Sequence, residues 1–135
     1  MAINGISSSI DIAISGLRAE STRMNVISAN IANSNVTETP DGGPYRRQDV
    51  TLATDAENLG GVTIQGVAGD FSTAFKEVYQ PGHPQADENG YVRMPNVELP
   101  IEMMNLVTAS RAYEANAAVL KRYKNSIDVT LELLR

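Results

Sequence analysis

The sequence contains no cysteine and no tryptophan, and its aromatic residues are five tyrosines and two phenylalanines. Without cysteine, neither a disulfide framework nor a thiolate metal site can form. With so few aromatic rings, a core has to be built mainly from aliphatic side chains. We therefore expect that the chain of 135 residues holds no cofactor and no metal, and that any large core is mainly aliphatic.

Long apolar runs are also absent. No stretch approaches the roughly 18 apolar residues that a membrane span requires, so no direct membrane span is expected. Near Met1 there is no basic region followed by an unbroken apolar segment, which predicts that no signal peptide is cleaved.

Positive charge is scarce, and the net charge is −5. Residues 36–97 account for this imbalance, with nine acidic against four basic side chains, while charges balance on either side. An acidic chain argues against nucleic acid as a partner. The neutral ends can pack closely, and the acidic middle faces solvent or a basic partner.

Two heptad stripes are present, one at each end of the chain. A seven-residue apolar repeat places side chains on one edge of a helix, and that edge has to be buried against another helix. The stripes predict helices over residues 3–33 and 98–134, with Ile27 joining the first at the second heptad position. Asn33 and Pro40 favour an end to the first helix, and Pro100 suits the first turn of the second. The stripe residues are Ile3, Ile10, Leu17, Met24 and Ile31, then Leu106, Tyr113, Leu120, Ile127 and Leu134.

The middle of the chain lacks the heptad period and is rich in glycine and proline. Short alternating patterns predict strands over residues 48–53, 62–67, 75–79 and 90–94. Gly60-Gly61 is expected to reverse the chain, and Asn89-Gly90 is the dipeptide favoured in tight hairpin turns. We therefore divide the chain into an N-terminal helix (1–35), a partly β insert (36–97) and a C-terminal helix (98–135).

These elements predict a mainly α fold with a small β insert. The two terminal helices are expected to pair as an antiparallel coiled coil. Two helices that bury apolar side chains only against each other barely offset the entropy lost on ordering. The balance favours partners beyond the chain itself, although a purely internal hairpin core is the alternative for the stripes.

Two segments resemble the end signatures of the bacterial flagellar rod and hook proteins. One is Arg-Met-Asn-Val-Ile-Ser-Ala-Asn-Ile-Ala-Asn-Ser-Asn at 23–35, and the other is Asn-Leu-Val-Thr-Ala-Ser-Arg-Ala-Tyr-Glu-Ala-Asn at 105–116. In the insert, Gly-Gly-Pro-Tyr-Arg-Arg at 42–47 and Pro-Gly-His-Pro at 81–84 are similar to the proximal rod subtype, as are 90–92 and 95–97. Gln85 departs from the more acidic loop expected there.

The resemblance implies a non-catalytic structural subunit of the proximal rod, which crosses the periplasm and transmits torque for motility. It implies export through the flagellar type III apparatus and a helical tubular assembly with the insert facing outward. The partners it implies are copies of the same chain, other proximal rod proteins, the rod–export-gate adaptor and the distal rod protein.

We expect the assembly interface to include the stripe residues together with Ile27, Asn30, Asn33 and Asn116. In the insert, we expect contacts through Tyr45, Arg46, Arg47 and Tyr91. For the asparagines, helix termination and a solvated face are an equally good interpretation. For the arginine pair, binding an acidic neighbour and remaining solvated are both open.

Two rival functions follow from the same residues. One is a non-catalytic coiled-coil module that displays its acidic insert to a receptor. The other is an enzyme that uses His83 with Asp87 or Glu88. The chain has only one histidine, and no nucleophile with a base and an orienting group is evident. A structural turn is the favoured interpretation of that loop.

Overall fold

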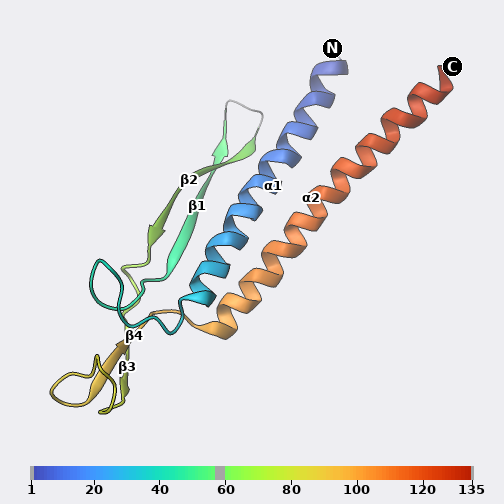
Figure 1. The fold of residues 1–135 in the computed structure, drawn as a ribbon. Helices are drawn as coiled ribbons and strands as arrows, with labels where there is room; N and C mark the ends of the chain where they lie inside the picture. Colours follow the sequence, from blue (N-terminus) through green and yellow to red (C-terminus); the bar gives the residue numbers. More distant parts are fainter. Residues whose placement is uncertain (1, 57–59, 135) are drawn as a thin grey trace.

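The computed structural model describes residues 2–56 and 60–134, with side chains described from Ser9 onward. Helix α1 (Ala2–Ala32) is followed by β1 (Gln48–Asp55), β2 (Gly61–Gly69), β3 (Lys76–Tyr79) and β4 (Tyr91–Met94), and α2 (Leu99–Leu133) completes the order (Figure 1). The prediction of a mainly α fold with a small β insert is confirmed. Both predicted helices lie within a residue of their expected bounds at each end.

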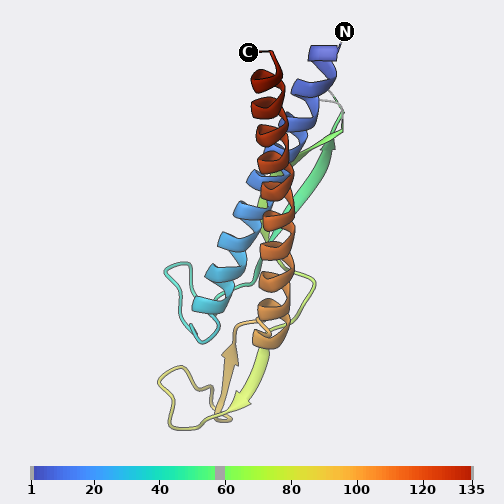
Figure 2. The same ribbon diagram turned by 90° about the vertical axis from the view of Figure 1, so that its right-hand side faces the viewer.

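The two helices run antiparallel, so that both chain ends lie at the same end of the molecule (Figures 1 and 2). The β1–β2 hairpin packs along α1, and α2 packs along another side of the same helix. Among the described residues, α2 contacts α1 but no strand. Helix α1 is therefore the middle layer of three.

Two contacts fix the alignment of the helices. Asn30 of α1 bonds Glu102 of α2, and a Cβ atom added to Gly16 would come within 2.9 Å of the Asn116 amide nitrogen. In each pair the residue numbers add up to 132. A residue i of α1 therefore lies level with residue 132 − i of α2, and the absence of a side chain at Gly16 allows close approach.

All four predicted strands are present, in two separate antiparallel hairpins. In the first, Gln48 pairs with Gly69 and Asp55 with Gly61, with an irregularity after Thr51. In the second, Lys76 pairs with Met94 and Tyr79 with Tyr91. The short β-type alternation was therefore sufficient to locate the strands.

The predicted turns differ in detail. Gly60 has a φ of 88°, as a chain reversal requires, but Gly61 already belongs to β2. Asn89-Gly90 does not form a two-residue hairpin turn, because eleven residues (80–90) join β3 to β4. Instead, the Asp87 carboxylate accepts bonds from the backbone N–H groups of Asn89 and Tyr91 and organises the end of that longer loop.

The hydrophobic core is small and aliphatic. Its fully buried members lie along the α1–α2 contact and beneath β4. No helix in the described part of the chain combines the length and apolarity needed to cross a membrane. The buried apolar side chains are Ala13, Ala19, Ile27, Val92, Val97 and Ala109.

Candidate functional site

A cluster of buried and half-buried polar side chains lies where the insert meets the helix ends that are remote from the chain termini, and we call it the junction. It joins the last turns of α1, the segment before β1, the segment before α2 and the first turn of α2. Asn30 and Glu102 are 0% and 1% exposed. The junction consists of Asn30, Tyr45, Arg47, Asn96 and Glu102.

Glu102 is the charged centre of the junction. Arg47 Nε donates to its Oε1 atom at 2.6 Å, and Asn30 Nδ2 donates to its Oε2 atom at 3.2 Å. The same guanidinium lies 3.5 Å from the Asp49 carboxylate and 3.9 Å from that of Asp70. Because an unpaired buried carboxylate is strongly destabilising, this ion pair holds the insert against the start of α2.

Asn30 connects α1 to β1. Its Nδ2 atom donates to the Gln48 carbonyl at 2.8 Å, and its Oδ1 atom accepts from the Gln48 N–H at 2.9 Å and the Tyr45 hydroxyl at 3.0 Å. With the bond to Glu102, the amide uses both donors and both acceptor positions. This side chain is therefore held by three segments at once.

Asn96 makes a second set of bridges just before α2. Its Oδ1 atom accepts from the Arg47 N–H at 2.7 Å. Its Nδ2 atom donates to the carbonyls of Asp70 and Thr73, both at 3.1 Å. The loop that precedes β3 is thereby tied to the same arginine that binds Glu102.

The charges of the junction shift its titrating groups. Burial, followed by the negative charge of Glu102, raises the pKa of the Tyr45 hydroxyl. Burial alone would lower the pKa of the Arg47 guanidinium, but the hydrogen bond and charge of Glu102, with help from Asp49, raise it. At the rim, hydrogen bonds from Ser72 and then Thr73 hold the pKa of the Asp70 carboxyl well below its usual range.

Arg46 points to a different environment from its neighbour. Its guanidinium lies over the rings of Phe71 and Phe75, 4.4 and 4.3 Å from their centroids, and donates to the Asp70 carbonyl at 2.9 Å. Both phenylalanines of the chain are used in this cation–π stack. Thus Arg46 and Arg47 both have partners within the chain, whereas Tyr91 is exposed and makes an edge contact with Tyr79.

The interface residues predicted on the helices fall in different environments. On α1, Ile27 is buried and Ile10, Leu17, Met24 and Ile31 are half-buried; the side chain of Ile3 lies outside the described residues. Asn33 donates to the Ala29 carbonyl and closes the end of α1, while Asn116 donates to the Ala112 carbonyl and faces Gly16. On α2, Leu106 and Leu120 are half-buried, and three stripe residues are exposed: Tyr113, Ile127 and Leu134.

The loop around His83 has the geometry of a turn. The His83 ring nitrogen Nδ1 accepts a bond from the Gln85 N–H at 3.1 Å, and the His83 N–H donates to the Gln80 carbonyl. Within residues 2–56 and 60–134, no group of three histidine or acidic side chains is placed to hold a metal ion. Asp87 is occupied by the turn bonds described above.

Two protein-family models match the chain. The model described as "Flagella basal body rod protein" matches residues 10–38, and "Flagellar basal body rod FlgEFG protein C-terminal" matches residues 88–133. The chain is 45% identical over 126 residues to the flagellar basal-body rod protein FlgC of Salmonella typhimurium, covering 91% of this chain and 93% of that protein. The chain belongs to the FlgC family.

Two further FlgC proteins support this assignment. The protein of Agrobacterium fabrum is 40% identical over 133 residues, covering 96% of each chain. That of Borreliella burgdorferi is 40% identical over 151 residues, covering 97% of this chain and 99% of the relative. All three relatives are named as flagellar basal-body rod proteins.

In this FlgC-family chain, the junction spans both matched segments. Asn30 lies in the first and Asn96 and Glu102 in the second, while Tyr45 and Arg47 lie between them. The sequence patterns point to Asn30, Tyr45 and Arg47 but not to Asn96 or to the burial of Glu102. The available signal was the position of Glu102 four residues before Leu106 and seven before Ala109, which places the acid on the buried face of α2, where it needs a partner.

Proposed function

We propose that the chain is a non-catalytic structural subunit of the rod of the flagellar basal body. It assembles with copies of itself and with other proximal rod proteins through the surfaces of α1 and α2. Family membership supports the rod assignment. Assembly through the helices is supported by the apolar side chains of α2 that no other part of the chain covers.

Helix α2 carries an unusual amount of exposed apolar side chain for a chain of this size. Among the described residues, no strand packs against α2, so the side of α2 that faces away from α1 is left uncovered. Exposed apolar surface of this extent marks an interaction site. The exposed large hydrophobic residues are Leu99, Ile101, Met103, Met104, Val107, Tyr113, Val119, Ile127, Val129, Leu131 and Leu133, with Leu134 just beyond the helix.

In the proposed assembly, the N-terminal helix (1–35) and the C-terminal helix (98–135) form coiled-coil contacts that build a tube. The insert (36–97) faces outward and fixes subunits against rotation about the tube axis. Torque is transmitted because many apolar contacts are shared between chains. The junction supports this role, since Glu102, Arg47 and Asn30 hold the insert rigidly on the helices.

We further propose that the rod spans the periplasm and that the chain is exported without cleavage of a signal peptide. The rod–export-gate adaptor and the distal rod protein are its proposed neighbours at either end. The alternative of a binding module that displays its acidic insert to a receptor has no support from the relatives, which are named as rod proteins.

The test uses a strain whose only copy of the chain carries a small tag in the exposed 80–90 loop. Tagged chain should co-purify with intact basal bodies, and deletion should abolish both rods and motility. Intact rods in the deletion strain would contradict the proposal. For the purified chain, helicity is expected to rise on polymerisation, whereas helicity that stays unchanged would favour the binding module.

A further inference from the structure

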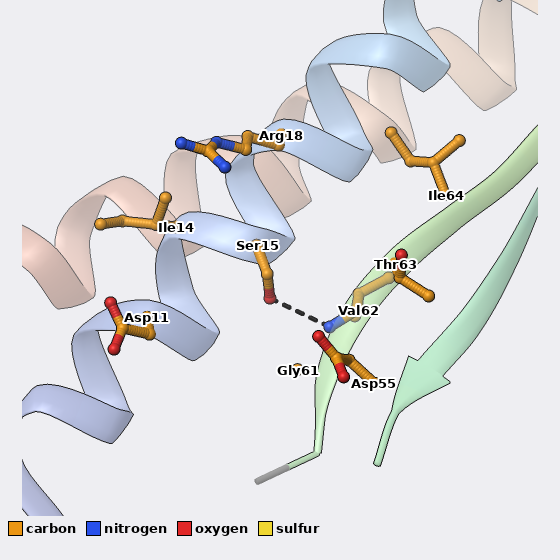
Figure 3. A pocket seen from close by; sticks show the side chains of 9 residues that line it. All are labelled: Asp11, Ile14, Ser15, Arg18, Asp55, Gly61, Val62, Thr63 and Ile64. Atoms are coloured by element: carbon orange, nitrogen blue, oxygen red, sulfur yellow. Dashed lines mark hydrogen bonds between the residues drawn. The ribbon is translucent and has the colours of Figure 1, made fainter. Parts of the chain in front are cut away.

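A shallow groove of about 460 Å³ runs between α1 and β2 (Figure 3). The Ser15 hydroxyl accepts a bond from the Val62 N–H at 3.0 Å and donates to the Ile12 carbonyl, so the groove is a fixed part of the fold. Ile14 and Ile64 give it apolar walls. It lies on the side of α1 covered by the β1–β2 hairpin rather than by α2.

The groove has charges of opposite sign along its length. Asp11 and Asp55 line one end, and Arg18 lies seven residues along α1 from Asp11, or about 10 Å at the helical rise. Asp11 and Arg18 are both exposed, and neither forms an ion pair with any described residue. A helix that carries a basic and an acidic side chain seven residues apart could therefore form ion pairs with both Asp11 and Arg18.

Such a helix is present in the chain itself. On α2, Glu114 and Lys121 are seven residues apart, lie on one side of the helix, and are both exposed without an ion pair among the described residues. Between them, Ala117 and Ala118 leave a thin surface that can approach a groove wall closely. This side of α2 is distinct from the side on which Asn116 meets Gly16.

We propose that the groove between α1 and β2 receives α2 of a second copy of this chain, with Lys121 beside Asp11 and Glu114 beside Arg18. The proposal rests on the self-assembly proposed above and names the surfaces that carry it. It places Ala118 of the second copy against Ile14. Both pairs have residue numbers that add up to 132, so the two copies lie side by side at the same axial height.

The orientation follows from the symmetry of an open assembly. Subunits related by a helical operator all point the same way, so α2 of the second copy must run antiparallel to α1 of the first. With Lys121 beside Asp11, the pairing of Arg18 with Glu114 gives this direction, because the residue numbers rise along α1 as they fall along α2. Pairing Lys121 with Asp11 and Asp128 with Arg18 would match the charges too, but it requires the second copy to be inverted.

Cysteine cross-linking tests the contact directly, because the chain has no cysteine of its own. Arg18→Cys combined with Glu114→Cys, expressed as the only copy in flagellated cells and oxidised, should give species at multiples of the 14.5 kDa chain mass. Arg18→Cys with Ser126→Cys is the matched control, because Ser126 is exposed and lies twelve residues, or about 18 Å, further along α2 than Glu114. The control should give at least about tenfold less cross-linked product, because a disulfide requires Cα atoms within about 7 Å.

The other outcomes overturn the proposal. A dimer from Arg18→Cys with Asp128→Cys, but not with Glu114→Cys, means inverted copies. Product whose mass is not a multiple of the chain mass means that another protein occupies the groove. Incorporation into basal bodies without any cross-link refutes the groove while the rod function stands, whereas failure of the unmodified chain to enter basal bodies refutes the rod function itself.

Charge reversal gives an independent measurement. Lys121→Asp and Asp11→Lys should each lower incorporation into basal bodies about fivefold, the effect of placing like charges in contact, and their combination should restore it. Arg122→Asp makes the same change of charge one residue further along α2. Asp11→Lys should not rescue Arg122→Asp, and rescue of both variants alike would show that only net charge matters.

Discussion

The two helices have nearly the same length and the same heptad pattern, yet their surroundings differ. Helix α1 has 31 residues and α2 has 35. No large hydrophobic side chain of α1 between residues 9 and 32 is exposed, whereas eleven are exposed on α2. The difference arises because α1 lies between the β1–β2 hairpin and α2, while α2 has a neighbour on one side only.

The comparison shows that a heptad stripe predicts a helix edge that has to be buried, but does not identify the element or chain that buries it. The α1 stripe is half-buried within the chain, and the α2 stripe becomes exposed toward its C-terminal end, from Ile127 to Leu134. By the alignment of the helices, Thr130 lies level with Ala2, the first residue of α1, so the last residues of α2 extend beyond α1. Helix α1 is covered on two sides within the subunit, whereas α2 keeps an uncovered apolar side.

The largest expected effect on the isolated subunit comes from removing the partner of Glu102. Arg47→Met leaves a carboxylate that is 1% exposed without its cation, and should lower the free energy of unfolding by about 3 kcal/mol. The measurement is urea unfolding of the purified chain, followed by circular dichroism.

A double variant sharpens this prediction. Arg47→Met with Glu102→Leu removes both charges and should recover most of the lost stability, because apolar replacement of a buried ion pair is often neutral. A cost below about 0.5 kcal/mol for the single variant would mean that the carboxylate is hydrated in solution and that the junction is open.

The next largest effect is expected where the helices approach most closely. Gly16→Leu inserts a side chain where even a Cβ atom lies 2.9 Å from the Asn116 amide, and should cost about 2 kcal/mol through overpacking. Asn116→Ala in the same chain should relieve part of that cost. Ala118→Leu, on the exposed side of α2, is the control and should leave the unfolding midpoint nearly unchanged.

A smaller effect is expected at the rim of the junction. Tyr45→Phe removes one hydrogen bond to Asn30 and should cost about 1 kcal/mol. The pKa of Tyr45 is raised in the folded chain above its ordinary value of 10.0, so its contribution is fully present below pH 10 and is lost as the pH rises through the folded pKa.

The pH dependence distinguishes this hydroxyl from the other tyrosines. Above pH 10, the free energy of unfolding of the natural chain should fall more steeply than that of Tyr45→Phe, as measured by urea titrations at pH 9 to 11. Equal slopes for the two proteins would contradict the burial of the Tyr45 hydroxyl. Tyr91→Phe is the matched control, since Tyr91 is exposed and has no hydrogen bond from its hydroxyl among the described residues.

Much of the fold could be predicted because local patterns were consistent with it. The heptad stripes located both helices, and alternation located all four strands. The pairing of strands into two separate hairpins could not be predicted, because it depends on contacts far apart in the sequence. The Asn89-Gly90 turn was misjudged because the Asp87 side chain competes for the local N–H groups and lengthens the loop.

The junction was only partly predictable for a related physical reason. Asn30 and Arg47 stood out as polar residues in marked positions, but their partners are 72 and 55 residues away at Glu102. Glu102 by itself has the sequence features of a carboxylate at the positive end of a helix. Its burial results from the Arg47 and Asn30 side chains that the insert and α1 bring to it.

A substitution at Leu131, near the end of α2, tests the comparison of the two helices most directly. It should change the free energy of unfolding of the subunit least and assembly into basal bodies most. Leu120 is half-buried against α1, so Leu120→Asp alters folding and assembly together. Leu131 is 61% exposed, so Leu131→Asp should change the free energy of unfolding by no more than about 0.5 kcal/mol. The same variant should nevertheless be exported and fail to enter basal bodies, which is measured by comparing secreted and rod-bound chain.

Asn125→Asp adds the same charge at an exposed polar position and serves as the control. A large loss of monomer stability in Leu131→Asp would mean that the end of α2 is already covered within a single chain, and the distinction between a stabilising α1 and an assembling α2 would be wrong.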